Sequence, residues 1–447
     1  MKKALEKYGR YAARAVLCVA VVLIAVGTGG ETAKVAPFAL ALVLLIAIGL
    51  LLLKNAKPLT LPFLQLNLLL IFCYDSFSFF IEYLWLLPVV VVALGVHLVR
   101  LRPRLLRGPT LLPLCAVALA TVLAGIGMIP VTDYVRPASL VFMAGLGPGL
   151  LLTYFILKNE TACEDATEDF FTDLLFWSVT ASAIVFAYMI PELFQSGAYH
   201  QMAMPQWSNN ISTILMISMP AVMGLKKRGY ISYVPLFFAY LAIVLSGSRG
   251  GLLLASLEFP LCCFWFWRTE KHPVQRLWYR LLFLYTLLIL SYFLYIGVRY
   301  APFFNLVLSG DVRWDLFSRG FSDFSENSMF GSGFGYRGNA DLYSGRTGTV
   351  NWYHLFIAQV VGGMGLCGIL AWGWQLWVRL RLSLKLWAKP QFALALCYLG
   401  LFLMSQVNPG EFCPTPYAFL AVYIFVLIEK ETQLAVASDT VAENDMQ

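Results

Sequence analysis

Apolar residues fill most of this chain in runs close to the length that crosses a lipid bilayer. The first run, 15–26, follows a basic start, and later runs fall at 35–53, 59–74, 77–99, 110–129, 140–157, 173–190, 211–225, 231–246, 251–267, 281–298, 354–377, 392–407 and 417–428. A helix needs about 20 apolar residues to cross the hydrocarbon core, so the runs predict an all-α polytopic transmembrane helix bundle of about 12–14 helices.

Composition excludes the soluble classes of protein. Hydrophobic residues make up 60% of the chain and charged residues 13%, whereas a soluble domain carries about a quarter charged residues. A water-soluble enzyme, a secreted disulfide module and a disordered regulator are therefore excluded. The net charge of +7 is not gathered on one face, so no nucleic-acid partner is expected. The nine cysteines include no CxxC pair, and neither a disulfide framework nor a metal site is predicted.

The positions of the basic residues predict the orientation in the membrane. Most of the 32 Lys and Arg residues lie in the basic N-terminus and in alternate connections after it. The positive-inside rule places those segments, and both termini, in the cytoplasm of a multi-pass protein. We divide the chain into N-terminal spans at 1–230, spans with a Ser-x-Ser-Arg-Gly motif at 231–298, a large extracytoplasmic catalytic loop with short helices at 299–353, C-terminal spans at 354–430 and a disordered cytoplasmic tail at 431–447.

The large loop is the longest polar stretch of the chain. Its positions Trp314, Phe317, Phe321 and Phe324 are spaced three, four and three residues apart, which predicts a short amphipathic helix at the membrane surface. It has no Lys, and its cations are Arg299, Arg313, Arg319, Arg337 and Arg346. Guanidinium groups suit bidentate phosphate contacts, although a loop Arg also commonly forms a local ion pair.

Three ionisable residues at the spans are candidates for chemistry. Arg249 lies between two apolar runs among small residues, and it either binds an anion or extends along the helix end to reach water. His354 opens the span after the loop, as an interfacial packing residue or as the best available general base. Glu258, inside a span, either pairs with Arg249 or faces a polar cavity.

Four motifs follow one another from the middle of the chain. They are 246–250 (Ser-Gly-Ser-Arg-Gly), 311–314 (Asp-Val-Arg-Trp), 327–333 (Asn-Ser-Met-Phe-Gly-Ser-Gly) and His354 followed by Gly365 and Gly368. In this order the motifs resemble those of the O-antigen ligase/polymerase family of bacterial membrane glycosyltransferases. The third has Ser328 in place of the family's proline, and the fourth has Leu355 where the family usually has a polar residue.

This resemblance implies an enzyme that needs no metal or other cofactor. Its donor would be a glycan on undecaprenyl diphosphate, and its acceptor a hydroxyl of lipid A-core or another surface glycan, at the outer face of the bacterial cytoplasmic membrane. Arg249 and Arg313 would bind the diphosphate, and His354 would deprotonate or orient the acceptor hydroxyl. The further residues predicted to contact the substrate are Arg319, Arg337, Arg346, Ser248 and Trp314. The surrounding membrane lipids are the other expected partners.

Other functions remain open from the sequence. Within the family, the protein could be a repeat-unit polymerase or an O-linked protein oligosaccharyltransferase. In a different class, it could be a lipid-glycan transporter. A transporter should have several ionisable groups at mid-bilayer and broken helices in paired positions. The polar residues here gather in one external loop instead, which favours chemistry at the membrane surface.

Overall fold

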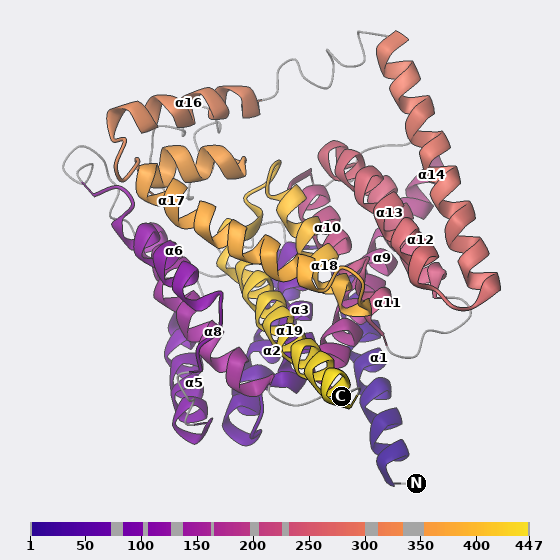
Figure 1. Ribbon diagram of the computed structural model, residues 1–447, viewed down its shortest axis with the longest axis horizontal. Helices are drawn as coiled ribbons and strands as arrows, with labels where there is room; N and C mark the ends of the chain where they lie inside the picture. The colour runs from indigo at the N-terminus through magenta and orange to yellow at the C-terminus, as the bar shows by residue number, and fades with distance from the viewer. Residues whose placement is uncertain are drawn as a thin grey trace. The chain divides into compact units, whose positions relative to one another are not determined.

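The computed structural model describes residues 2–72, 84–101, 106–126, 137–161, 165–196, 205–225, 232–299, 312–333 and 353–445. Within these ranges every regular element is a helix, and no strand occurs (Figure 1), which confirms the all-α prediction. Five described helical segments are long and apolar enough to cross a membrane, namely Tyr8–Thr28, Thr32–Leu52, Ala166–Pro191, Arg249–Thr269 and Phe356–Lys385.

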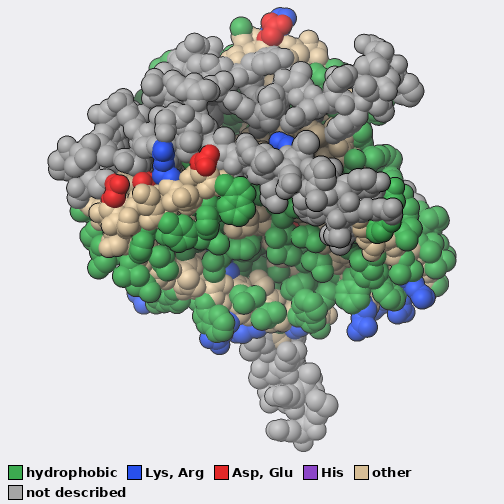
Figure 2. Space-filling view, turned by 90° about the horizontal axis from the view of Figure 1, so that it is seen from above, with side chains coloured by type: hydrophobic (Ala, Val, Ile, Leu, Met, Phe, Trp, Pro, Cys, Tyr) green, Lys and Arg blue, Asp and Glu red, His purple; other side chains and the backbone are tan. Residues whose placement is uncertain are grey.

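Large apolar side chains are widely exposed on these helices. Val16 and Leu23 of the first span are 69% and 67% exposed, and Leu288 further along the chain is 69% exposed. Figure 2 shows hydrophobic side chains over much of the face seen there. Apolar surface on this scale is unfavourable in water and suits contact with lipid.

The chain divides into two compact units that alternate along the sequence. The first comprises Met1–Arg104, Asn159–Phe259 and Lys271–Gln275, and the second comprises Leu105–Lys158, Pro260–Glu270 and Arg276–Gln447. These units are defined by contacts between residues in space. The five segments predicted from the sequence are defined by membrane topology, which the two units do not test.

In the first unit, helices pack around α9 (Ala166–Ser196), which contacts α1, α3, α10, α11 and α12. Its residues Phe170, Trp177 and Ile184 have no exposed surface, as expected of a helix that other helices surround. The other helices of the unit are α1 (Lys2–Thr28), α2 (Thr32–Leu52), η1 (Lys57–Leu59), α3 (Thr60–Ile71), η2 (Leu84–Leu86), α5 (Leu87–Leu101), α10 (Pro205–Ser218), α11 (Ala221–Gly224), α12 (Tyr233–Leu245) and the first half of α13 (Arg249–Thr269).

In the second unit, α17 (Phe356–Lys385) is central and packs on α6, α16 and α19. The second half of α13 also belongs to this unit. Its other helices are α6 (Leu111–Leu123), α7 (Pro137–Leu146), α8 (Pro148–Glu160), α14 (Pro273–Arg299), α16 (Val312–Glu326), η4 (Pro390–Phe392), α18 (Ala393–Met404), η5 (Gly410–Phe412), η6 (Pro414–Ala418) and α19 (Phe419–Asp445).

Three stretches differ from the sequence prediction. The run at 140–157 is split into α7 and α8 before Pro148, and the run at 211–225 is split into α10 and α11 around Pro220. In both, proline lacks the N–H that would continue the preceding helix. The segment 431–447, predicted to be disordered, continues α19 as far as Asp445, because its Ala, Glu, Gln and Leu residues favour helix.

Candidate functional site

The first predicted motif forms the turn between α12 and α13, in the first unit. Gly247 has a φ of 75°, which glycine adopts without a steric penalty. The buried Ser248 hydroxyl accepts the N–H of Gly251 at 3.0 Å and donates to Oδ1 of Asn209 at 2.6 Å. Ser248, predicted to contact substrate, therefore caps the start of α13 in this structure.

Arg249 is the first residue of α13 and its side chain is exposed. Within the part of the chain that the structure describes, its guanidinium makes no hydrogen bond or ion pair. The first turn of a helix also presents unpaired N–H groups and a partial positive charge, which attract anions. Arg249 is thus an exposed cation at the start of a helix, and its predicted role in binding an anion stays a prediction.

Glu258, on the same helix, is fully buried. Neither of its carboxylate oxygens has a hydrogen-bond partner among the described residues. Nine residues of α-helix separate it from Arg249, a rise of about 14 Å, so the two side chains do not pair. Glu258 is a buried polar group that no contact in the described structure accounts for.

In the second unit, the aromatic spacing of the loop forms the predicted helix, α16 (Val312–Glu326). The rings of Trp314 and Phe317 lie 6.1 Å apart, and those of Phe317 and Phe321 lie 4.9 Å apart, both edge-to-face. Trp314 is 60% exposed and Phe321 is 45% exposed. The helix therefore presents part of its aromatic face outward, where it can meet lipid or a sugar.

Glycine residues bring α16 into close contact with α17. A Cβ atom on Gly320 would lie 3.0 Å from Cβ of Ala358, and a Cβ atom on Gly362 would lie 2.7 Å from the carbonyl oxygen of Gly320. Only a residue without a side chain permits this approach. The predicted loop helix is accordingly packed directly on the first turns of α17.

Helix α17 is broken at Gly365, and the glycine-rich turn after α16 bonds to the backbone groups at this break. Gly365 has φ 63° and ψ −154° inside that helix, so Leu366 and Cys367 lose their usual carbonyl acceptors four residues earlier, at Gly362 and Gly363. Their N–H groups bond instead to the carbonyls of Ser328 and Met329, at 2.8 and 3.2 Å, while the freed carbonyls accept the N–H groups of Ser332 and Gly333, at 2.8 and 2.9 Å.

This exchange satisfies all four backbone groups that the break would leave unpaired. It also joins two motifs that lie 34 residues apart in the sequence, around Gly331 and around Gly365. Since the N–H groups of Ser332 and Gly333 are occupied by carbonyls of α17, they are not free to cradle a phosphate. The role of this turn in the described structure is to hold α17 in its broken form.

A buried hydrogen-bond network lies beside this break. The Tyr353 hydroxyl donates to the Asp323 carboxylate of α16 and lies 2.9 Å from the Ser332 hydroxyl, which in turn lies 3.1 Å from the carbonyl oxygen of Gly362. Tyr353 is 1% exposed and Asp323 5%. Burial raises the pKa of the Asp323 carboxyl above its usual range, and the hydrogen bond from Tyr353 lowers it part of the way back.

His354 follows Tyr353 and has a φ of 49°, the one positive φ of a non-glycine residue among the described residues. This left-handed conformation costs a residue with a Cβ atom on the order of 1–2 kcal/mol. The backbone is held on both sides, since Tyr353 N–H donates to Oε1 of Gln359 at 3.3 Å and Phe356 N–H donates to the Ser405 carbonyl at 2.9 Å. Strain that is retained in this way is typical of functional positions.

Leu355, between His354 and α17, is the N-cap residue and has an extended backbone. Its aliphatic side chain makes no capping hydrogen bond. A polar residue at this position would be able to cap the helix, so α17 lacks a side-chain cap because this residue is a leucine.

The predicted cationic residues of the loop are only partly described. Arg319 lies one turn before Asp323 on α16, and its positive charge also lowers the pKa of the Asp323 carboxyl. Arg313 lies in the first turn of α16, but its side chain is outside the described residues, as are Arg337, Arg346 and Asp311. Trp314, Arg319 and His354 thus belong to one packed region of the second unit, while Ser248 and Arg249 belong to the first unit.

Two buried ion pairs tie the C-terminal helices of the second unit together. Glu429 accepts hydrogen bonds from Thr110 N–H, Tyr154 and Lys158, at 2.8, 2.9 and 2.6 Å. Further along α17, Arg379 pairs with Glu411. The carboxylates of Glu429 and Glu411 each have hydrogen-bond donors, so we assign both ion pairs a structural role. Among the described residues, no three His, Cys, Asp or Glu side chains are arranged to hold a metal ion.

The sequence pointed to His354 but not to the groups that position it. Tyr353, Asp323 and Gln359 became visible only through tertiary contacts, because each is an ordinary residue type with no distinctive spacing. A search with family models and a search of curated proteins find no match to this chain.

Proposed function

We propose that this protein is a glycosyltransferase of the bacterial cytoplasmic membrane that takes its glycan from undecaprenyl diphosphate and attaches it to an acceptor hydroxyl. The observation that carries the proposal is the strained backbone of His354, braced by Tyr353 and Asp323 next to an Arg-containing loop helix. An imidazole with a pKa near neutrality is suited to accept a proton from a hydroxyl group.

The proposed arrangement has about 12–14 membrane spans, with both termini in the cytoplasm and the loop 299–353 outside. Support comes from the five described helices of spanning length and from shorter apolar helices beside them. In this orientation α16 and His354 face the compartment in which lipid-linked glycans are joined to surface acceptors.

The proposed reaction forms one bond and breaks one. The acceptor oxygen bonds to the anomeric carbon as the bond between that carbon and the diphosphate oxygen breaks, and the hydroxyl proton passes to the His354 imidazole. The leaving diphosphate stays on the lipid and gains negative charge. Arg313, in the same unit as His354, would stabilise that charge, because a guanidinium group forms strong charge-assisted bonds with phosphate oxygens. The resemblance of the sequence motifs implies the same role for Arg249.

The surface-glycan ladder of a deletion strain tests this proposal. The strain is complemented with wild type, Arg249→Ala, Arg313→Ala, His354→Ala or, as a matched control, Arg381→Ala, which removes an exposed cation near the far end of α17. We expect the first three variants to leave full-length glycan on its carrier lipid and the control to restore attachment.

Other ladder patterns identify the alternatives. Single repeat units on the acceptor would make the protein a polymerase, and loss of glycan from proteins alone would make it a protein oligosaccharyltransferase. Normal ladders from all three well-expressed site variants would contradict the proposed site. Accumulation of lipid-linked glycan on the cytoplasmic side of the membrane would contradict the enzyme and support a transporter.

A further inference from the structure

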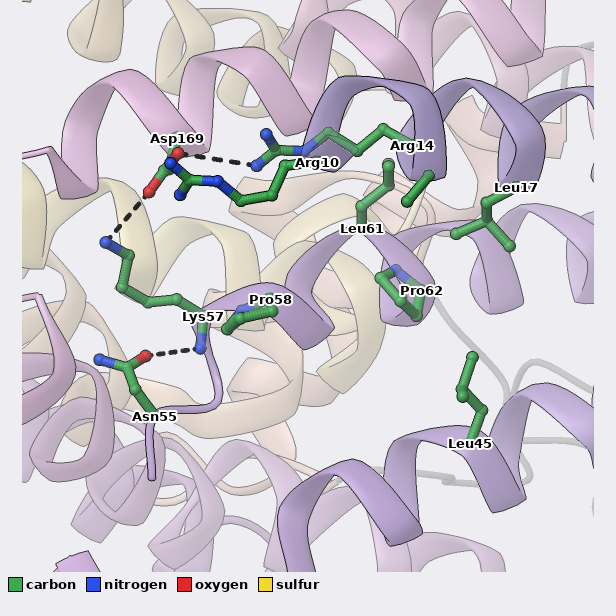
Figure 3. A pocket seen from close by; sticks show the side chains of 11 residues that line it. Arg10, Arg14, Leu17, Leu45, Asn55, Lys57, Pro58, Leu61, Pro62 and Asp169 are labelled. Carbon is green, nitrogen blue, oxygen red and sulfur yellow. Dashed lines mark hydrogen bonds and ion pairs between the residues drawn. The ribbon is translucent and has the colours of Figure 1, made fainter. Parts of the chain in front are cut away.

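The first unit contains a cavity that the proposed reaction does not use. It has a volume of about 440 Å³ and lies where α1 begins, α2 ends and α3 and α9 begin. Figure 3 shows charged side chains gathered on one side of it and leucine side chains on the other. The residues that matter to the argument are Arg10, Arg14, Lys57, Leu17, Leu45 and Leu61.

The charged side of this cavity carries more cations than acids. Arg14 pairs with Asp173 at 2.8 Å and with Asp169 at 3.7 Å, and Lys57 pairs with Asp169 at 3.2 Å. Arg10 is exposed at the mouth and makes no ion pair within the described part of the chain. Three cations and one carboxylate, Asp169, thus line this cavity, which suits an anionic ligand.

The apolar side of the cavity is formed by residues of two candidate membrane spans. Leu17 belongs to the candidate span Tyr8–Thr28, and Leu45 belongs to the candidate span Thr32–Leu52. Arg14 and Arg10 lie about one and two turns before Leu17, toward the start of the first span. A ligand in this position would place its charge at the helix ends and its apolar part along the leucines, which is how a phospholipid lies in a bilayer.

A smaller cavity of about 140 Å³ adjoins the first and shares Arg10 and Arg14 with it. Its other side chains are polar or acidic, among them Asp165, Glu168 and Thr172. Carboxylate and hydroxyl oxygens accept hydrogen bonds from alcohol groups. This second cavity therefore fits the hydroxyl groups of a polar headgroup attached to the phosphate.

We propose that the cavity at the start of α1 binds an anionic phospholipid, with its phosphodiester on Arg10 and Arg14, its acyl chain along Leu17 and Leu45, and its headgroup hydroxyls toward Asp165 and Glu168. The site is separate from the proposed transfer reaction. It would fix the ends of four helices to the leaflet that carries the anionic lipid.

The test is native mass spectrometry of the full-length protein released from mixed micelles containing phosphatidylglycerol, phosphatidylethanolamine and phosphatidylcholine. We expect phosphatidylglycerol to be retained preferentially. Arg10→Gln should weaken its retention about tenfold, since a charge-assisted contact is lost. The matched control Lys54→Gln removes an exposed positive charge at the same end of the unit but outside the cavity, and should change retention less than about twofold because salt screens it.

Two further arms separate the lipid from other ligands. Leu45→Trp fills the apolar side and should reduce lipid retention while leaving the basic side chains in place. Displacement of the lipid by inorganic phosphate at millimolar concentration would reassign the cavity to a small anion and overturn the proposal. Equal retention of the three lipids, a preference for phosphatidylethanolamine, or equal effects of Arg10→Gln and Lys54→Gln would also overturn it.

Discussion

The hydroxyl of Tyr353 donates a hydrogen bond to the carboxylate of Asp323, 30 residues earlier in the chain, and the residue after Tyr353 is the strained His354. One bond thus connects the helix of the loop to the start of α17. The same hydroxyl also lies next to Ser332, at the turn that fills the break in α17.

Replacing Tyr353 by Phe should destabilise the protein. The change keeps the ring but leaves the buried Asp323 carboxyl without its donor, and an unsatisfied buried group costs about 1–3 kcal/mol. The measurement is the free energy of unfolding in detergent. Tyr285→Phe is the matched control, because Tyr285 is 58% exposed and loses no buried bond. Equal stability of the two variants would show that the Tyr353–Asp323 bond contributes nothing.

Stability should depend on pH through Asp323. Its folded-state pKa is raised, chiefly by burial, so the folded protein holds this proton more tightly than the unfolded chain does. The resulting stability is fully present below the ordinary Asp pKa of about 3.9 and is lost as the pH rises through the higher folded-state pKa. The unfolding midpoint should therefore fall as the pH rises through that window.

Asp323→Asn isolates this contribution, since the amide oxygen still accepts the bond from Tyr353 and does not titrate. We expect a flatter dependence of the unfolding midpoint on pH than in wild type. Asp315→Asn, which removes an exposed carboxylate of the same helix, should leave the wild-type slope. A wild-type slope in Asp323→Asn would contradict the assignment.

The break in α17 predicts that alanine substitutions at two glycines of this helix have opposite effects on stability. An alanine at Gly365 would adopt a conformation reserved for glycine and place its Cβ 2.7 Å from backbone atoms of Ser328, Met329 and Gly331. We expect Gly365→Ala to cost about 2–4 kcal/mol. A Cβ on Gly373 would meet nothing within 4 Å, so Gly373→Ala should stabilise the helix by about 0.5–1 kcal/mol. Thermal unfolding of both variants measures the difference, and similar midpoints would argue against the break.

Glu258 predicts a gain in stability on substitution. Both carboxylate oxygens are buried without a described partner, so Glu258→Leu should stabilise the protein by about 1–3 kcal/mol. Glu258→Gln keeps a buried polar group and should gain less. A lower unfolding midpoint for Glu258→Leu than for wild type would mean that the carboxyl has a partner essential to the fold.

Several features of this structure could be predicted from the sequence. The aromatic spacing from Trp314 to Phe324 marks α16, because a helix has a period that a single segment reveals. The small residues around Gly247 mark a turn between two apolar helices for the same local reason. The apolar runs predict the helical class, although Pro148 and Pro220 divide two of them.

The contacts that shape the site are not local and could not be predicted in this way. Gly365 looks like one of several glycines in an apolar helix, and its left-handed backbone depends on the turn at 327–333 to bond the freed groups. Similarly, nothing in the residues near Tyr353 or Asp323 reveals that they meet. The sequence also does not reveal that Ser248 caps a helix. Only its hydrogen bonds to Asn209 and Gly251 show this.

The most direct test of the proposed function is the rate of glycan transfer by purified protein in nanodiscs. The donor is an undecaprenyl-diphosphate-linked glycan and the acceptor is a lipid-bound sugar hydroxyl. The informative variant is His354→Asn, because asparagine tolerates the left-handed backbone but has no imidazole. His272→Asn, which changes an exposed histidine, is the control. We expect metal-independent transfer by wild type and the control, and a rate at least about 100-fold lower for His354→Asn. Equal rates for the two variants, or no transfer by wild type, would contradict the account.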